Sequence, residues 1–468
     1  MEDLKMYIGG KWTPGHSGER IEVENPATKE IIGTVPRGNE EDVDAAAEAA
    51  KEGYQVWKTY SVRERTRCLR RLADDLDRHA EEIADTITRE LGAPVSMAKD
   101  WHVAAAGSET RCFADWAEML SYEEQKDGYI LRREPFGIVA AVTPWNFPLD
   151  QALLKVLPAL AAGNCVILKP SQLTPMTACR LAECIDRCGF PAGVFNLVTG
   201  KGAEVGNALA GHPDIRMISF TGSTSAGREV ARRALSNIKK CTLELGGKSA
   251  GIVLNSADFS LAADVMLEDC FMNTGQICNA MTRMLVPASG KEEMEKLLVE
   301  KAAKFKVGDP MDKNTVVGPL VSKKAFESVK RYIETGVREK ARMLVGEIPQ
   351  ECENGYYVKP VIFTDVTSQM TIAREEIFGP VLSVIFYDTV EEAIRITNDS
   401  SYGLCGGVFG EEKEALNAAR LMETGVVRIN GAEIPSGAPF GGYKESGIGR
   451  ENCIQSIDEF MEVKSIVI

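Results

Sequence analysis

The strongest constraint on the fold is an alternation of short apolar runs with helical segments, which begins near residue 138. Four runs have strand-like composition: GIVAAVTP, NCVILKPS, VFNLVTG and RMISFTGS. Helical patterns lie between and after them: LLKVLPALAAG, MTACRLAECIDRCG, GAEVGNALAGH and SAGREVARRALSN. Strand–helix alternation of this kind predicts a parallel, doubly wound sheet, which binds ligands at the carboxyl ends of its strands.

The alternation of strand-like and helical segments resumes after residue 247. Strand-like SAGIVLN, TRMLVPA and PVLSVIFY alternate with helical EEMEKLLVEKAAKF and AFESVKRYIETGVREKA. Near the start, helices are predicted in EEDVDAAAEAAKEGYQVW and SVRERTRCLRRLADDLDRHAEEIADTITRELG, which carry apolar residues at three-to-four spacing; the second stretch ends at a glycine stop. A chain of 468 residues is long enough for two or three domains. We therefore expect two α/β domains, with some strand pairing outside them.

Composition excludes several classes of protein. The balance of 54 basic against 68 acidic residues, without a basic run, argues against nucleic acid as a partner. No apolar stretch is long enough to span a membrane, and the start MEDLKMYIGGKW lacks the apolar region of a secretion signal. The 12 cysteines form no CxxC pair and the four histidines are isolated, so we expect neither disulfides nor a metal site. A cytoplasmic or other reducing location is predicted.

The stretch FMNTGQICNA places Cys278 at the end of a polar turn that contains glycine. A buried structural thiol is one interpretation, since free cysteine is often a core residue. A thiolate nucleophile is the other, and it would need an activator other than histidine.

Two further stretches suit nucleotide binding. FTGSTSAG sets Gly222 and Ser223 before a helix, where backbone N–H groups could hold a pyrophosphate, although neither it nor LELGGKS is a nucleotide-hydrolase loop. Lys169 ends a strand candidate before Pro170 and could hold ribose or phosphate. An ordinary glycine turn and a surface lysine are the alternatives.

Two other residues suit catalysis. Asn146 in TPWNFP could donate to an oxyanion, or could be a turn asparagine bonding its own backbone. Glu244 precedes Gly246 and Gly247 and could act as a general base whose pKa is raised by the flanking leucines. A solvated surface glutamate is the alternative.

Taken together and in order, these motifs resemble the aldehyde dehydrogenase superfamily over essentially the whole chain. The matching motifs are PWNFP, KPSQLTP, FTGSTSAG, LELGGKS, FMNTGQIC, EEIFGPV and PFGGYKESGIGRE. The resemblance implies an α/β fold with a doubly wound, Rossmann-like cofactor domain, an α/β catalytic domain and a small β oligomerisation arm. It places them at 1–116 with 136–246, at 247–445, and at 117–135 with 446–468. GYILRRE and SIVI would form the arm of a homodimer or homotetramer.

The resemblance also implies a hydrolytic mechanism that uses NAD or NADP. Cys278 matches the nucleophile that forms a thiohemiacetal with the aldehyde, and Asn146 matches the oxyanion donor. Loss of hydride to the nicotinamide gives a thioester, which water activated by Glu244 hydrolyses to the acid. Lys169 matches the lysine that binds the ribose of the cofactor, and we count it among both the catalytic and the cofactor-binding residues.

The remaining site residues follow from the same resemblance. The cofactor would contact Trp145, Lys169, Gln172, Gly222, Ser223, Leu245, Glu376 and Phe378. The substrate pocket would include Phe147, Ile277, Asn279 and Phe440. No metal is implied.

Three departures qualify the match. Gln172 replaces the glutamate of many NAD-preferring members, which removes a charge that repels a 2′-phosphate and predicts use of NADP as well as NAD. Ile454 occupies the position of an acid that many members carry, so a second acid in a proton relay is in doubt. Ile277 and Asn279 vary in the family and do not name the substrate.

Other functions stay open at this point. A CoA-acylating enzyme would resolve the thioester with CoA, and a non-catalytic relative would use none of this chemistry. Glu244 argues against the first, and the intact set of Cys278, Asn146 and Glu244 argues against the second. Arg111 could attract a carboxylated aldehyde or could be a helix-surface charge.

Overall fold

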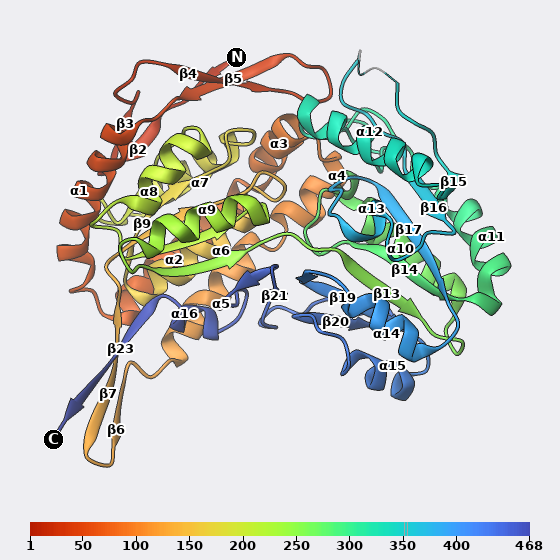
Figure 1. Ribbon diagram of the computed structural model, residues 1–468. Coiled ribbons are helices and arrows are strands. Elements are labelled where there is room, and N and C mark those ends of the chain that lie inside the picture. The colour runs from red at the N-terminus through yellow and green to blue at the C-terminus, as the bar shows by residue number, and fades with distance from the viewer. Residues whose placement is uncertain (351, 353) are drawn as a thin grey trace.

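The computed structural model describes residues 1–350, 352 and 354–468. Two α/β units lie side by side, each built on its own sheet, and a narrow β-hairpin projects from one of them (Figure 1). The predicted α/β, doubly wound architecture is confirmed.

The first unit is built on an eight-stranded sheet in the order β22-β12-β11-β8-β9-β10-β2-β3. Its five central strands are parallel, as the strand–helix alternation predicts. They are β8 (Ile138–Val142), β9 (Cys165–Lys169), β10 (Phe195–Leu197), β11 (Met217–Thr221) and β12 (Lys240–Glu244). The edges are antiparallel: β2 (Met6–Ile8) and β3 (Lys11–Thr13) at one side, β22 (Gly447–Ile448) at the other. The segment Gly447–Ile448 thus lies in this sheet and not in the arm.

Helices surround this sheet; some turn an apolar stripe toward its strands, and others pack on those helices as an outer layer. They are α1 (Glu40–Trp57), α2 (Val62–Arg78), α3 (Ala80–Leu91), α5 (Ala106–Met119), α6 (Asp150–Ala162), α7 (Met176–Arg187), α8 (Asn207–Gly211) and α9 (Thr224–Leu235), with short α4 (Val95–Met97), α16 (Gln455–Asp458) and π-helical η1 (Ala98–Val103) and η2 (Gly202–Gly206). The helical prediction for residues 61–92 is confirmed, and the stretch forms two helices that end at Gly92. The chain leaves helical geometry at His79, whose ring Nδ1 lies 2.8 Å from the Asp75 carbonyl oxygen, so α2 ends there and α3 begins.

The second unit contains a seven-stranded sheet in the order β15-β16-β17-β14-β13-β19-β20. Its strands are β13 (Ser249–Val253), β14 (Met281–Pro287), β15 (Arg342–Val345), β16 (Val361–Thr364), β17 (Val381–Tyr387), β19 (Cys405–Phe409) and β20 (Val426–Ile429). Around it lie α10 (Phe259–Phe271), η3 (Met272–Gly275), η4 (Ala288–Gly290), α11 (Lys291–Ala302), α12 (Lys323–Arg338), α13 (Thr371–Arg374), α14 (Val390–Asn398) and α15 (Glu412–Ala419). Only the pairing of β15 with β16 is antiparallel within the described part of this sheet.

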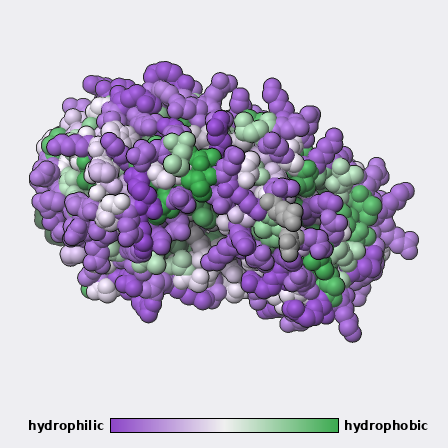
Figure 2. All heavy atoms as spheres, turned by 90° about the horizontal axis from the view of Figure 1, so that it is seen from above, coloured by the Kyte–Doolittle hydropathy of each residue, from purple (hydrophilic) through white to green (hydrophobic). Residues whose placement is uncertain are grey.

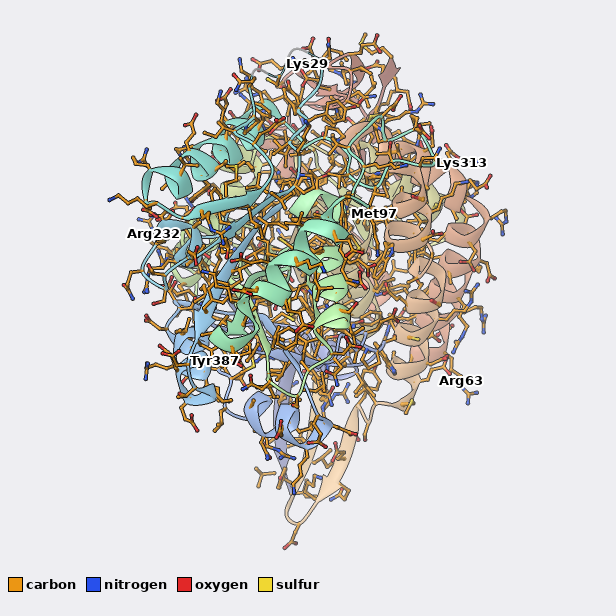
Figure 3. All side chains as sticks on the ribbon, turned by 90° about the vertical axis from the view of Figure 1, so that its right-hand side faces the viewer. Lys29, Arg63, Met97, Arg232, Lys313 and Tyr387 are labelled. Carbon is orange, nitrogen blue, oxygen red and sulfur yellow. The ribbon has the colours of Figure 1, made fainter. Side chains whose placement is uncertain are left out.

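Three small sheets complete the fold. The hairpin consists of β6 (Glu123–Lys126) and β7 (Tyr129–Pro135), and β23 (Met461–Val467) joins it with Ile466 opposite Ile130. The three strands project from the body in two views (Figures 1 and 3). The others are β1 (Glu2–Asp3), β4 (Arg20–Glu24) and β5 (Ile31–Pro36), and the pair β18 (Tyr402–Gly403) and β21 (Tyr443–Lys444).

The surface is dominated by hydrophilic side chains, with scattered apolar patches on the face that Figure 2 shows. In the larger sheet of the first unit, the central strands β8 and β9 are buried at every position. Among the described residues, none of the helices has the length and apolar character needed to cross a membrane.

Candidate active site

Cys278 follows a strained turn between α10 and β14. Three successive residues, Asn273, Thr274 and Gly275, have φ values of +51°, +58° and +72°. Such left-handed geometry is costly for residues other than glycine, and persists only where packing enforces it. Here the turn packs closely against the EEIFGPV motif. A Cβ on Gly275 would lie only 2.2 Å from the carbonyl carbon of Gly379, so no larger residue fits at position 275. The sequence thus fixes the approach to Cys278 through close backbone packing.

Asn146 is held against this turn. Its side-chain Nδ2 donates to the Gln276 carbonyl oxygen at 3.0 Å, and Asn273 Nδ2 donates to the Asn146 carbonyl oxygen at 2.8 Å. Asn146 is 4% exposed. The amide therefore bonds to the segment that carries the cysteine, and not to its own backbone as the turn-asparagine alternative required.

The Cys278 thiol lies in surroundings that favour its protonated form. Burial is the main cause that raises its pKa, and the carboxylates of Glu244 and Glu376 raise it further. Backbone N–H groups of Cys278 and Asn279 act in the opposite direction. A group that removes the proton, or a positive charge close to the sulfur, is needed to make it nucleophilic.

Glu244 ends β12 and is 6% exposed, so the solvated-surface alternative is wrong. Burial raises its pKa well above the ordinary value, and the nearby Glu451 carboxylate adds to the effect. Its Oε1 atom has no hydrogen-bond partner among the described residues. An unpaired carboxylate of raised pKa beside two glycines is suited to accept a proton.

A second acid is present behind Glu244. Glu451, from the motif GRE, forms a buried ion pair at 2.5 Å with Lys155 of α6. Ile454 therefore does not leave Glu244 without a neighbouring acid, because Glu451, three residues earlier, is near enough for its charge to raise the pKa of Glu244. Sequence reasoning missed both partners, although a lysine inside the apolar run LLKVLPALAAG was a usable signal.

A cavity of about 420 Å³ opens on one side of Cys278, and we call it the cofactor-side cavity. Gly222 and Ser223 line it at the start of α9, where the Ser223 hydroxyl accepts from the Ala226 N–H at 3.3 Å. Of the residues predicted for catalysis or cofactor binding, this cavity brings together Trp145, Asn146, Gly222, Ser223, Leu245, Cys278, Glu376 and Phe378.

Glu376 and Phe378 approach Cys278 from the second unit. The Glu376 carboxylate accepts from the Gly247 N–H at 3.1 Å, and burial raises its pKa to about 7. Phe378, at φ +59°, packs edge-on against Trp145 with ring centroids 5.2 Å apart. The two units therefore meet at the cavity.

Two predicted cofactor residues lie outside the wall of this cavity. Lys169 ends β9 and is buried, and its Nζ donates to the Pro170 carbonyl oxygen at 2.8 Å. Burial lowers the pKa of Lys169 to about 8, so the surface-lysine alternative is wrong. Gln172 is half-buried in the loop that follows. Conversely, sequence reasoning missed one wall, contributed by Val321, Ser322, Lys324, Ala325 and Ser328 around the start of α12.

A second cavity of about 330 Å³ opens on the other side of Cys278, and we call it the substrate-side cavity. All four predicted pocket residues line it: Phe147, Ile277, Asn279 and Phe440. Cys278 and Gln151 line both cavities. Acidic residues of this wall, among them Glu109 and Asp150, were not foreseen from the sequence, because they come from different helices.

Arg111 does not reach this cavity. Its guanidinium bonds to the carboxylates of Asp74 and Asp77, each at 2.7 Å, on the surface of α2. The helix-surface interpretation of this arginine is confirmed.

Comparison with known proteins agrees with this geometry. The model of the aldehyde dehydrogenase family matches residues 12–466. A cysteine-to-alanine mutant of aldehyde dehydrogenase C from Pseudomonas syringae, solved with NAD+ and octanal, is 42% identical; the match covers 99% of this chain and 96% of that one, with a TM-score of 0.98. An aldehyde dehydrogenase from Bacillus cereus, solved with NAD+, is 39% identical over 100% of this chain and 96% of that one, with a TM-score of 0.97.

A Staphylococcus saprophyticus relative, whose name places it among the aldehyde dehydrogenases without a substrate, is 45% identical over 99% of this chain and 98% of its own. These matches extend over nearly the whole sequence. The chain belongs to the aldehyde dehydrogenase family and is an oxidoreductase that acts on the aldehyde group.

Proposed function

We propose that this enzyme oxidises an aldehyde to the carboxylic acid with NAD, through a covalent bond between the aldehyde carbon and Cys278 Sγ. The observation that carries the proposal is the position of Cys278, which lines both the cofactor-side and the substrate-side cavity. One sulfur atom is therefore accessible to a cofactor from one side and to an aldehyde from the other.

The cofactor-side cavity fits a dinucleotide. The first turn of α9, a helix of 12 residues, presents backbone N–H groups beside Gly222 and Ser223, which suits a pyrophosphate. A Cβ on Gly246 would lie 2.2 Å from a Glu376 carboxylate oxygen, so glycine is needed to keep that carboxylate in place for ribose hydroxyls. NAD, when bound, accepts the hydride. Relatives solved with NAD+ support this assignment.

The chain's own residues carry the covalent step. The Cys278 thiol loses its proton to solvent, which leaves Glu244 unprotonated for the later step. The sulfur then bonds to the aldehyde carbon, and the carbonyl oxygen becomes an oxyanion stabilised by the Asn146 amide and the Cys278 backbone N–H. The strained turn at residues 273–275 fixes both donors before the substrate arrives.

Hydrolysis of the thioester follows from the position of Glu244. Its unpaired Oε1 takes a proton from water, and the resulting hydroxide attacks the acyl carbon to release the acid and the Cys278 thiolate. The buried Lys155–Glu451 pair modulates the charge of Glu244, because Lys155 lowers the pKa of Glu244 and Glu451 raises it.

The test is a pair of variants assayed with a simple aldehyde and NAD. Cys278→Ala removes the nucleophile, so we expect loss of measurable NADH formation, while Cys241→Ala, at a thiol outside both cavities, serves as control. Full activity of Cys278→Ala contradicts the mechanism. Acid formed by the wild type without CoA separates hydrolysis from the CoA-acylating alternative.

The assembly belongs to the same proposal. We assign 1–116 with 136–246 to cofactor binding, 247–445 to catalysis, and the sheet of β6, β7 and β23 to contact with another copy. Support comes from apolar side chains left exposed on β23, including Val463 and Val467, which are 63% and 82% exposed. We expect a homodimer or a homotetramer.

A further inference from the structure

The substrate-side cavity carries an excess of negative charge. Four acidic residues line it, Glu109, Asp150, Asp269 and Glu433, against one basic residue among those described, Arg428. The Arg428 guanidinium is already committed, because it pairs with the Asp269 carboxylate and donates to the Ala432 carbonyl oxygen at 2.8 Å. Three acidic side chains are therefore left without a basic partner among the described residues of the cavity wall.

Glu109 of α5 and Asp150 at the start of α6 are close enough to affect each other. Burial raises the pKa of Glu109 to about 8 and that of Asp150 to about 6, and the charge of Asp150 raises the pKa of Glu109 further. Glu109 therefore holds its proton near neutral pH until a positive charge approaches. No lysine or arginine of the described chain forms an ion pair with either one, and the Asp150 carboxylate accepts from the Gln151 side chain at 3.1 Å. A cation placed between them would lower both pKa values and stabilise the two carboxylates.

These acids do not form an isolated cluster, since the same cavity ends at the nucleophile. Cys278 and its neighbours Ile277 and Asn279 share its wall with the rings of Trp101, Phe147 and Phe440. Carboxylates stabilise a cation by charge, and aromatic faces stabilise it through the ring quadrupole. An anionic substrate would meet repulsion along the same path.

The negative charge continues outward. An adjoining cavity of about 420 Å³ shares Trp101, Asp269, Arg428 and Glu433 with the substrate-side cavity. Its own wall adds Asp100 and Glu268 against Lys313, so acids remain in the majority along the approach. Met97 and Lys313, both of this wall, are labelled on the face seen in Figure 3. A passage lined by one sign of charge attracts ligands of the other sign.

We propose that the substrate is an aldehyde with a cationic group, an amine or a quaternary ammonium, held by Glu109 and Asp150 while its carbonyl carbon lies at Cys278. This inference rests on the proposed function, in which Cys278 bonds to the aldehyde carbon. It names the class of substrate that the proposed mechanism acts on.

The experiment compares two substrates of matched shape, 4-(trimethylammonio)butanal and 5,5-dimethylhexanal, in which a neutral carbon replaces the charged nitrogen. We expect kcat/KM to be at least about tenfold higher for the cation, with the difference reduced at high salt. Glu109→Gln combined with Asp150→Asn should bring the ratio of the two values close to one. Glu118→Gln is the matched control, because Glu118 lies on the same helix but bonds to Thr66 and Arg70 outside the cavity.

The possible outcomes separate the two proposals. Turnover of the neutral aldehyde with a ratio of one or less overturns the cationic class and leaves the proposed function intact. A ratio that the double variant does not change, or a preference for succinate semialdehyde, also overturns it. Failure of every aldehyde to give NADH overturns the proposed function itself.

A second measurement does not depend on turnover. Choline should slow the alkylation of Cys278 by iodoacetamide in the wild type, whereas its neutral counterpart 3,3-dimethylbutan-1-ol should have a smaller effect at the same concentration. Glu109→Gln with Asp150→Asn should remove the difference. Equal protection by the two compounds in the wild type counts against the proposal.

Discussion

Glu244 has both features of a general base for hydrolysis, burial and an unpaired oxygen. In Glu244→Gln the thiohemiacetal and the first hydride loss remain possible, so we expect one rapid equivalent of NADH per subunit. Steady turnover should fall by about 10²–10⁴-fold, the usual contribution of general base catalysis. Rapid-mixing absorbance at the NADH band measures both phases. If the first equivalent of NADH is lost as well, Glu244 is needed in a step before hydride transfer, which contradicts a role limited to hydrolysis.

The pH dependence of turnover has a defined sign. A carboxyl with a raised pKa stays protonated over a wider pH range, and a protonated carboxyl cannot accept a proton from water. The steady rate of the wild type should therefore rise with pH and level off above the raised pKa of Glu244. Glu244→Gln should lack this rise. A rate that falls with pH over the same range contradicts the assignment.

Gln172 determines the expected response to the 2′-phosphate of NADP. A carboxylate at this position would repel that phosphate at short range, so Gln172→Glu should raise the KM for NADP by about tenfold or more while the KM for NAD changes less. Gln172→Met keeps the position neutral and serves as control. The assay is kcat/KM with each cofactor. A wild-type KM for NADP thousands of times that for NAD excludes dual use.

At the scale of residues, the sequence is most informative where a short motif contains the chemistry. Cys278, Asn146 and Glu244 each belong to a motif with glycine or proline. The structure bonds Asn146 to the turn before Cys278, and it places Glu244 near enough for its charge to raise the pKa of the Cys278 thiol. Lys155 and Glu451 are far apart in the chain, and their ion pair exists only after α6 packs against the C-terminal segment. No local pattern encodes such a contact.

At the scale of elements, α7 starts at Met176 without a capping side chain of its own. Glu90 of α3 supplies the cap from a distance: its carboxylate accepts from the N–H groups of Met176 and Thr177 at 2.8 and 2.9 Å. Glu90→Ala leaves both buried donors unpaired, and we expect a loss of about 1–3 kcal/mol in the free energy of unfolding. Glu81→Gln, at a side chain 90% exposed on the same helix, should change it by less than about 0.5 kcal/mol.

Urea denaturation followed by circular dichroism measures both variants. Equal stability of Glu90→Ala and the wild type would show that water replaces the cap.

Strand positions were predictable because a short apolar run bounded by glycine or proline residues is too short for a typical helix and fits a buried strand. The split between α2 and α3 was not, since the apolar spacing continues through His79. The competing force there is a hydrogen bond of the imidazole to the Asp75 carbonyl, which a periodicity argument does not contain.

At the scale of the whole molecule, the two units and the site depend on each other. Glu376 and Phe378 of the second unit reach the cavity that Trp145 and Ser223 of the first unit line. The sequence predicts each unit by its own alternation, but their relative placement follows from packing across the junction. The negative charge of the substrate-side cavity likewise arises at this scale, from acids on separate elements.

The sheet of β6, β7 and β23, which we call the β-arm, leaves apolar side chains exposed that a second chain could cover. β23 is an edge strand, and an exposed apolar edge is a template for pairing with another chain unless a partner covers it. Val463 and Val467 point to the same side, because side chains alternate along a strand. Val463→Lys with Val467→Lys should therefore convert the assembly to monomers, as light scattering after size-exclusion chromatography would show.

Leu421→Lys with Val337→Lys adds the same charge at apolar residues that are 59% and 43% exposed elsewhere, and it should keep the wild-type mass. A wild type that is already monomeric at micromolar concentration contradicts the assignment of the arm. So does an arm variant of unchanged mass. If the arm variant is monomeric but still oxidises aldehydes, the site is complete within one chain.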